Sequence, residues 1–423
     1  MGLASAVLLN LNGVVGAGIF ALPAILYASA GSLAPLAILV FALFLSASLA
    51  IVAKLSTLFD QSGGPQLYLH HAFGEVAGFQ GGWLAVCGNM ASRAANFHVM
   101  AAYLAALFPV FEPTPMRLAV ILALIVIFAG LAIFGTRQAI GALWAGSALK
   151  LAPLFALCIA GLAINGAPSA VSLPDFSEVE AVALALAYAF SGGGVATASA
   201  GETRDAGRTV ARSMYINLAV VALFYAFIQF SYEAINPAID DPTRALSAAG
   251  AAVFGDIGVT IISLAAIVSI ATGQLNFFIA MPRILFGMGR RGSLPRIFGF
   301  LSDRSKTPSA AIGIYSGVVA ALALSGTFAV LVSLLVAADV ILSFALIGAL
   351  YQIWRRNTAG IADTMGPIWI PVGLIAAGFI IWLGLQLPLT AYLGTGAMMA
   401  VGMGLYWLAK RAGHAGEPIH IIE

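Results

Sequence analysis

The chain is a succession of long apolar runs, and this feature limits its fold more than any other. A helix needs roughly 20 predominantly apolar residues to span a bilayer, and turn residues or charges divide the sequence into twelve runs of that order. The runs occupy residues 3–28, 33–58, 78–108, 117–134, 139–164, 179–200, 208–235, 254–288, 309–327, 329–353, 367–386 and 388–409. They are apolar on every side, as in Leu118–Ala129, whereas barrel strands alternate with a period of two. The sequence therefore predicts an all-α integral membrane protein with 12 transmembrane helices.

Composition excludes several classes of function. Charged residues make up 9% of the 423 residues, against about 25% in ordinary soluble domains. The net charge of +2 gives no electrostatic reason to expect a nucleic-acid partner. Cys87 and Cys158 both lie inside apolar runs, so a disulfide scaffold or a metal site is not predicted. We expect membrane lipids around the chain, with no cofactor and no metal.

The positions of the basic residues predict the orientation, because Lys and Arg accumulate in short cytoplasmic loops. With the N-terminus inside, the outer loops hold only Arg117 and Arg244, and two basic residues, Arg93 and Lys150, fall within spans. The cytoplasmic loops and tail hold Lys54, Arg137, Arg204, Arg208, Arg212, Arg283, Arg290, Arg291, Arg296, Arg304, Lys306, Arg355, Arg356, Lys410 and Arg411. This asymmetry predicts a multi-pass protein of the cell membrane with both termini in the cytoplasm.

Glycine clusters interrupt spans one and six, at Gly13–Gly18 and at Ser191–Gly194. Each glycine weakens a helix by about 1 kcal/mol relative to alanine, and paired interruptions in two halves indicate a secondary transporter with inverted repeats. Unwound backbone in a membrane needs partners for its N–H and C=O groups. A helix N-terminus attracts a carboxylate, and freed carbonyls accept from an ammonium group. A zwitterionic amino acid carries both groups; packing or kink glycines are the alternative.

Three segments resemble signatures of the amino acid–polyamine–organocation (APC) permeases of the bacterial type. They are GVVGAGIFALP (Gly13–Pro23), SGGPQLYLHHAFG (Ser62–Gly74) with the following GGW, and AYAFSGGGVATASAGETRDAGRTVARS (Ala187–Ser213). The resemblance implies a 5+5 inverted-repeat core in residues 1–355, with the first repeat in 1–164 and the second in 179–355. It also implies two additional transmembrane helices in 356–411 and a cytoplasmic tail in 412–423.

The same resemblance assigns a substrate site to the interrupted spans. It places the substrate carboxylate on the N–H groups of Gly16, Ala17 and Gly18. The ammonium group would meet the carbonyls of Val14, Tyr188 and Ser191, and Gly192 completes the candidate site. Tyr188 is either a gate over the substrate or ordinary packing. Some relatives carry an acid in span six where this chain has Gly194, so a proton-sensing role is not transferred to that position.

Lys150 lies within span five, at a position that in some bacterial relatives carries a lysine in place of a sodium ion. It is about eleven residues into the span, roughly 16 Å at 1.5 Å per residue, which is deep for a snorkelling side chain. We expect Lys150 to couple transport to protons, with snorkelling as the alternative.

Span three is polar on one face, because Asn89, Arg93 and Asn96 follow a spacing of i, i+4 and i+7. Asn89 and Arg93 are candidate substrate residues. Asp339 lies at a similar depth in span ten, so Arg93 and Asp339 are a possible intramembrane pair. Such a pair would line the cavity or fix the helix register; alternatively, Arg93 would meet an acidic group of the substrate.

Four polar residues of span eight are candidates for ion or substrate contacts, or for bonds to neighbouring backbone: Ser269, Thr272, Gln274 and Asn276. No catalytic constellation is identifiable, so an enzyme is not predicted. We expect a secondary active transporter that moves amino acids by alternating access and is linked to protons. The alternatives are an amino acid exporter or exchanger, and a sensor that does not translocate. The loop at Phe108–Leu118 has no cysteine, so a disulfide-linked partner subunit is not expected.

Overall fold

The structure is a computed structural model that describes residues 3, 7, 11, 13–59, 64–134, 140–168, 179–192, 206–302, 306–356, 366 and 368–412. Regular secondary structure in these ranges is helical throughout, as the sequence predicts. The first helices are α2 (Ala17–Ala30), α3 (Ala34–Leu58), α4 (Gly64–Phe73), α5 (Glu75–Leu107), α6 (Thr114–Phe134), α7 (Ile140–Asn165) and α8 (Val179–Ala189). The others are α10 (Ala206–Ile235), α11 (Ala245–Phe254), α12 (Asp256–Arg290), α13 (Ser309–Ser325), α14 (Phe328–Arg355), α15 (Trp369–Leu385) and α16 (Leu389–Arg411). Short 3-10 helices include η2 (Pro109–Phe111) and η5 (Pro242–Arg244).

The predicted count of twelve membrane-spanning helices is not confirmed. By length and composition, five helical stretches of the described residues are able to cross a membrane, the first being Ala17–Leu58. The pair α15 and α16, bent by 108°, makes a sixth if it counts as one span. Lys150–Asn165 and Ser309–Ser325 are apolar but shorter. The short helices α4 and α11 are not among the predicted runs.

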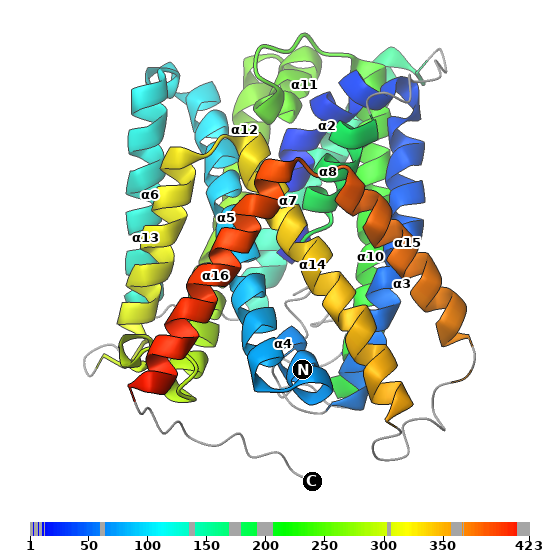
Figure 1. The fold of residues 1–423 in the computed structure, drawn as a ribbon. Coiled ribbons are helices and arrows are strands. Elements are labelled where there is room, and N and C mark those ends of the chain that lie inside the picture. Colours follow the sequence, from blue (N-terminus) through cyan, green and yellow to red (C-terminus); the bar gives the residue numbers. More distant parts are fainter. Residues whose placement is uncertain are drawn as a thin grey trace.

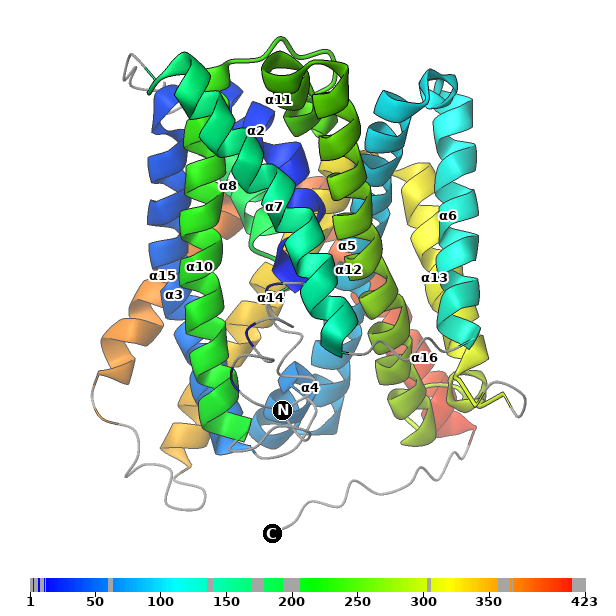
Figure 2. The same cartoon turned by 180° about the vertical axis from the view of Figure 1, so that it is seen from behind.

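Helix α5 forms the centre of the bundle, where most of its residues are buried. It packs against α4, α12, α13 and α14, while α10 packs against α3 and α7. Figures 1 and 2 show the short helices α4 and α11 at opposite ends of the bundle. We use these two helices to name the ends.

Glycines at and after the turn between α4 and α5 bring the two helices close together. A Cβ atom on Gly78 would lie 2.6 Å from the Cβ of His70, and one on Gly81 would lie 2.2 Å from Leu69 Cδ1. A larger side chain at Gly78 would push the two helices apart, because the backbone of α4 lies 2.9 Å away, whereas one at Gly81 would displace the flexible Leu69 side chain. Gly74 makes the turn between them with a φ of 93°, which glycine adopts without strain.

Candidate functional site

Span one is interrupted at the predicted glycine cluster. Gly13 and Val14 are helical, Val15 and Gly16 form a bend, and α2 starts at Ala17. Gly16 is the N-cap of α2, and no side chain caps the helix there. The first N–H groups of a helix have no partner within it, so this end of α2 presents donors and the positive end of the helix dipole.

The end of α8 lies against this bend. Helix α8 ends at Ala189 and is followed by a turn through Gly192, whose φ is 94°. A Cβ atom on Gly192 would lie 2.6 Å from the carbonyl oxygen of Gly13, so the two segments touch through their backbones. The predicted pairing of the two clusters in space is thus visible up to Gly192. Gly193, Gly194 and Glu202 lie outside the described residues.

Gly16 and Gly18 have different surroundings. A Cβ atom on Gly18 would lie 2.8 Å from the Cα of Ala189, so Gly18 is needed for the close packing of α2 on α8. Among the described residues, a Cβ atom on Gly16 would meet only the Val14 carbonyl oxygen, at 4.0 Å. Gly16 is therefore the position where the backbone borders open space.

The carbonyl groups freed by the bend accept hydrogen bonds from three distant helices. Lys150 Nζ donates to the Val15 oxygen at 3.0 Å, and Ser269 Oγ donates to the same oxygen at 3.1 Å. The Tyr225 hydroxyl donates to the Val14 oxygen at 3.1 Å. Lys150 is fully buried, so it does not snorkel to the surface.

Part of the predicted ammonium site is already engaged by the protein. Besides the Val14 oxygen, the Tyr188 oxygen accepts from the Ser191 hydroxyl at 2.7 Å and from the Ser191 N–H at 3.1 Å. A carbonyl oxygen has two lone pairs, and the Val14 oxygen also accepts from the Gly16 N–H at 2.8 Å, so both of its lone pairs are engaged. The Gly16 N–H, predicted for the substrate carboxylate, is engaged by the same bond. In this conformation the Tyr188 oxygen has neither lone pair to spare.

The polar face of α5 lies where several helices meet. The side-chain oxygen of Asn89, Oδ1, accepts from the Tyr315 hydroxyl of α13 at 2.6 Å, and the side-chain amide of Asn96 lies 2.5 Å from the Tyr188 hydroxyl of α8. Arg93 lies between these two asparagines and is 4% exposed. The predicted clustering of Asn89, Arg93 and Asn96 on one face is therefore present, close to the end of α8.

Asp339 lies on the face of α14 that points into the helix bundle. It is exposed, yet Leu335 and Val336, about one turn before it, are buried. The exposed apolar side chains Phe344 and Tyr351 lie roughly 120–140° away around the helix. Asp339 therefore does not belong to the apolar outer face of α14.

Arg93 and Asp339 form no ion pair in the part of the chain that the structure describes. Arg93 is buried among the groups of α5, whereas Asp339 is exposed. The two helices do touch, because a Cβ atom on Gly88 of α5 would lie 3.0 Å from the Cβ of Ala338. The two charges thus lie on neighbouring helices without meeting in this conformation.

Other polar side chains of α12 and α5 lie within hydrogen-bond distance of backbone carbonyl groups. Gln274 Nε2 donates to the Arg93 carbonyl at 3.0 Å, so it links α12 to the polar face of α5. Thr272 donates to carbonyls of its own helix, as expected for a structural hydroxyl. His98 Nε2 lies 3.0 Å from the Ala323 oxygen, and the described residues hold no cluster suited to a metal ion.

Sequence reasoning missed Tyr225, Tyr315 and Phe277, which complete the surroundings of these sites. Tyr225 bonds the broken backbone, Tyr315 bonds Asn89, and the Phe277 ring lies against Arg93. Each stands in an apolar run where an aromatic residue is unremarkable. Nothing in their spacing marks them, since the partners are on other helices.

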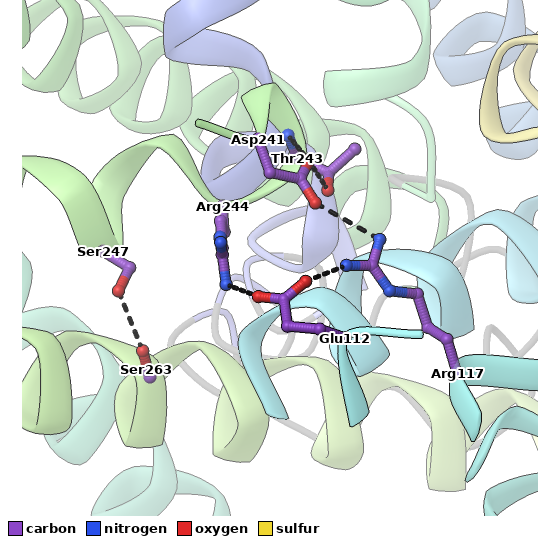
Figure 3. A network of polar contacts seen from close by, with 7 residues as sticks. All are labelled: Glu112, Arg117, Asp241, Thr243, Arg244, Ser247 and Ser263. Atoms are coloured by element: carbon purple, nitrogen blue, oxygen red, sulfur yellow. Dashed lines mark hydrogen bonds and ion pairs between the residues drawn. The ribbon is translucent and has the colours of Figure 1, made fainter. Parts of the chain in front are cut away.

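Four charged residues join loops at the α11 end of the bundle (Figure 3). Glu112, after η2, accepts from Arg117 at 2.8 Å and from Arg244 at 2.6 Å, and Arg117 also bonds Asp241 at 3.3 Å. Partial burial raises the pKa of Asp241, but bonds from Thr243 and the charges of Arg117 and Arg244 outweigh this and lower it below its usual value. In the same region the Ser247 and Ser263 hydroxyls, 3.1 Å apart, join α11 to α12.

Comparison with known proteins identifies the family. The family model described as "Amino acid permease" matches residues 1–408. The chain belongs to this family. The resemblance of the glycine-rich signatures is thus confirmed over nearly the whole chain, and the permease is an integral membrane transporter and not an enzyme.

Curated relatives are transporters as well. An uncharacterized transporter of Mycobacterium tuberculosis is 26% identical to the permease over 433 residues, which cover 97% of this chain and 91% of the relative. The serine/threonine exchanger SteT of Bacillus subtilis is 26% identical over 311 residues, 70% of this chain and 69% of the relative. The methylthioribose transporter of the same organism is 32% identical over 156 residues, 36% of this chain and 33% of the relative.

Proposed function

We propose that the permease is a secondary active transporter that moves amino acids across the cell membrane by alternating access. The observation that carries this proposal is the bare N-terminus of α2 at Gly16, beside the end of α8. The N–H groups of Ala17 and Gly18 suit a substrate carboxylate. The Ser191 carbonyl suits an ammonium group, and the Val14 and Tyr188 carbonyls would contribute only if the bonds that now engage them open.

Lys150 is the proposed coupling residue. Its ammonium group donates to the Val15 carbonyl oxygen, which lost its helical partner at the bend and would otherwise suit a bound cation. The Ser269 hydroxyl donates to the same oxygen. A lysine exchanges a proton when it is buried, unlike an arginine. Loss of its proton would remove the charge that holds α7 to the bend of span one, and this supports a link between protonation and the position of α2.

In this proposal the α11 end faces outward and both termini are cytoplasmic, following the distribution of basic residues. Exchange of one amino acid for another is the second candidate, favoured by the likeness to the serine/threonine exchanger. A sensor that does not translocate has no comparable support.

Uptake of radiolabelled amino acids into proteoliposomes tests the proposal. We expect uptake driven by a pH gradient, with little effect of sodium. Uptake that needs a second amino acid inside the vesicles would establish exchange instead. Binding of amino acids without any uptake, under either condition, would contradict the transport proposal.

A further inference from the structure

Arg93 is a buried guanidinium group in the middle of α5. The side chain is 4% exposed, and its Cζ atom lies 4.1 Å from the centre of the Phe277 ring. A charge inside a membrane helix costs about 2.5–3.5 kcal/mol even on insertion scales. Such a charge therefore needs a compensating partner, and the chemistry of that partner indicates the function of Arg93.

The partners that the described residues supply to Arg93 are neutral. Nη2 donates to the Ser92 hydroxyl at 2.9 Å. The side-chain amide of Asn96 finds partners for both its oxygen and its nitrogen in one of its two orientations. In that orientation the Asn96 oxygen accepts from Arg93 Nη1 at 3.2 Å. Among the described residues, the Nε–H group has no hydrogen-bond partner and the guanidinium group forms no ion pair.

In the part of the chain that the structure describes, the groups around Arg93 leave its positive charge uncompensated. Of the described titratable groups, the Tyr188 and Tyr315 hydroxyls interact with it electrostatically, and both are uncharged at neutral pH. Asp339, on the neighbouring helix α14, forms no ion pair with it. Stacking on Phe277 stabilises the flat face of the guanidinium group and leaves its edge for hydrogen bonds.

We propose that Arg93 forms a subsite for a carboxylate on the substrate side chain, so that the permease carries acidic amino acids. This inference rests on the proposed function and adds the substrate class. A guanidinium group binds a carboxylate through two parallel hydrogen bonds, and a free Nε–H is one of the donors that such a pair uses. The main-chain groups of the substrate would remain at the bend of span one, to which Arg93 is connected through Asn96 and Tyr188.

The position of Tyr188 fits this arrangement. Tyr188 lies in the last turn of α8, directly before the turn that touches Gly13, and its hydroxyl reaches the polar face of α5. The ring also packs edge-on against Phe328 of α14. Arg93 is covered in this conformation, so a substrate carboxylate would reach it when α8 and its tyrosine move.

The test compares substrates that differ by one charge. Uptake of glutamate and glutamine, and of aspartate and asparagine, is measured with the wild type, Arg93→Gln, Arg93→Lys and the control Arg355→Gln, an exposed arginine at the end of α14. We expect the wild type to prefer the acidic member of each pair. Arg93→Gln should lower kcat/KM for acidic substrates by about tenfold or more, while uptake of the amides stays within about twofold.

Arg93→Lys keeps the charge but loses the paired donors, so it should retain part of the acidic preference. Thermal stability of each purified variant separates loss of folding from loss of recognition. If Arg93→Gln does not fold, a lower acid-to-amide ratio in folded Arg93→Lys decides the question. A wild type that carries neutral amino acids with no acidic preference, or equal losses for acids and amides in the variants, would overturn the inference and leave the permease function intact. A wild type that carries no amino acid would instead refute the proposed function.

Discussion

The Nζ atom of Lys150 lies 3.0 Å from the carbonyl oxygen of Val15, although the two residues are on different helical segments. This bond ties α7 to the place where span one is interrupted. The carbonyl is available because the bend at Val15 and Gly16 removes its partner within the helix. Ser269 of α12 bonds the same oxygen, so α7 and α12 meet at this one backbone atom.

Replacing Lys150 tests its part in transport. Lys150→Met removes the charged donor while keeping an unbranched apolar chain, so uptake should fall by about tenfold or more and lose its dependence on pH. Ser269→Ala is the matched control, because it removes a neutral donor from the same oxygen and should leave the pH dependence in place. Retention of pH-dependent uptake in Lys150→Met would exclude Lys150 from coupling.

Gly16 and Gly18 should respond differently to substitution. Gly16→Ala places its methyl group in open space, so the protein should keep its thermal stability while its affinity for amino acids falls. Gly18→Ala forces α2 away from Ala189 and should destabilise the protein by about 1–3 kcal/mol. Thermal melts and substrate binding of both variants check the difference. Normal affinity in stable Gly16→Ala would contradict the carboxylate site.

The Asp241 cluster predicts a loss of stability in acid. Because its pKa is lowered in the folded protein, Asp241 stabilises the fold above its unfolded pKa of about 3.9. That contribution is lost as the pH falls through the lower folded value. Thermal melts of the purified protein from pH 7 to pH 3 should therefore show a smaller decline for Asp241→Asn than for the wild type. Asp240→Asn, which changes an exposed neighbour, should behave as the wild type.

Arg93 and Asp339 should act independently in stability, because they form no ion pair in this conformation. In a double-mutant cycle with Arg93→Ala and Asp339→Ala, we expect a coupling energy below about 0.5 kcal/mol. A larger coupling would show that the two charges meet in another conformation. The measurement is the free energy of unfolding, or the melting temperature where unfolding is irreversible.

Much of the architecture is readable from local sequence alone. A helix in a membrane satisfies its own backbone hydrogen bonds, so apolar runs of sufficient length must be helical wherever they lie. For the same reason, the interruption at Gly13–Gly18 is visible in the sequence: glycine is a weak helix former, and the observed bend falls within the cluster. The helices α4 and α11 are ten residues long, too short to span a bilayer, so apolar length does not reveal them.

The contacts that complete the candidate site follow from packing between distant segments. Tyr225 and Val14 are 211 positions apart, and Tyr315 and Asn89 are 226 apart, so no local spacing connects them. Depth along a helix suggested that Arg93 and Asp339 would pair, but depth carries no information on rotation and side-chain direction. Those depend on how α5 and α14 pack, and here the packing buries Arg93 against Phe277 and leaves Asp339 exposed.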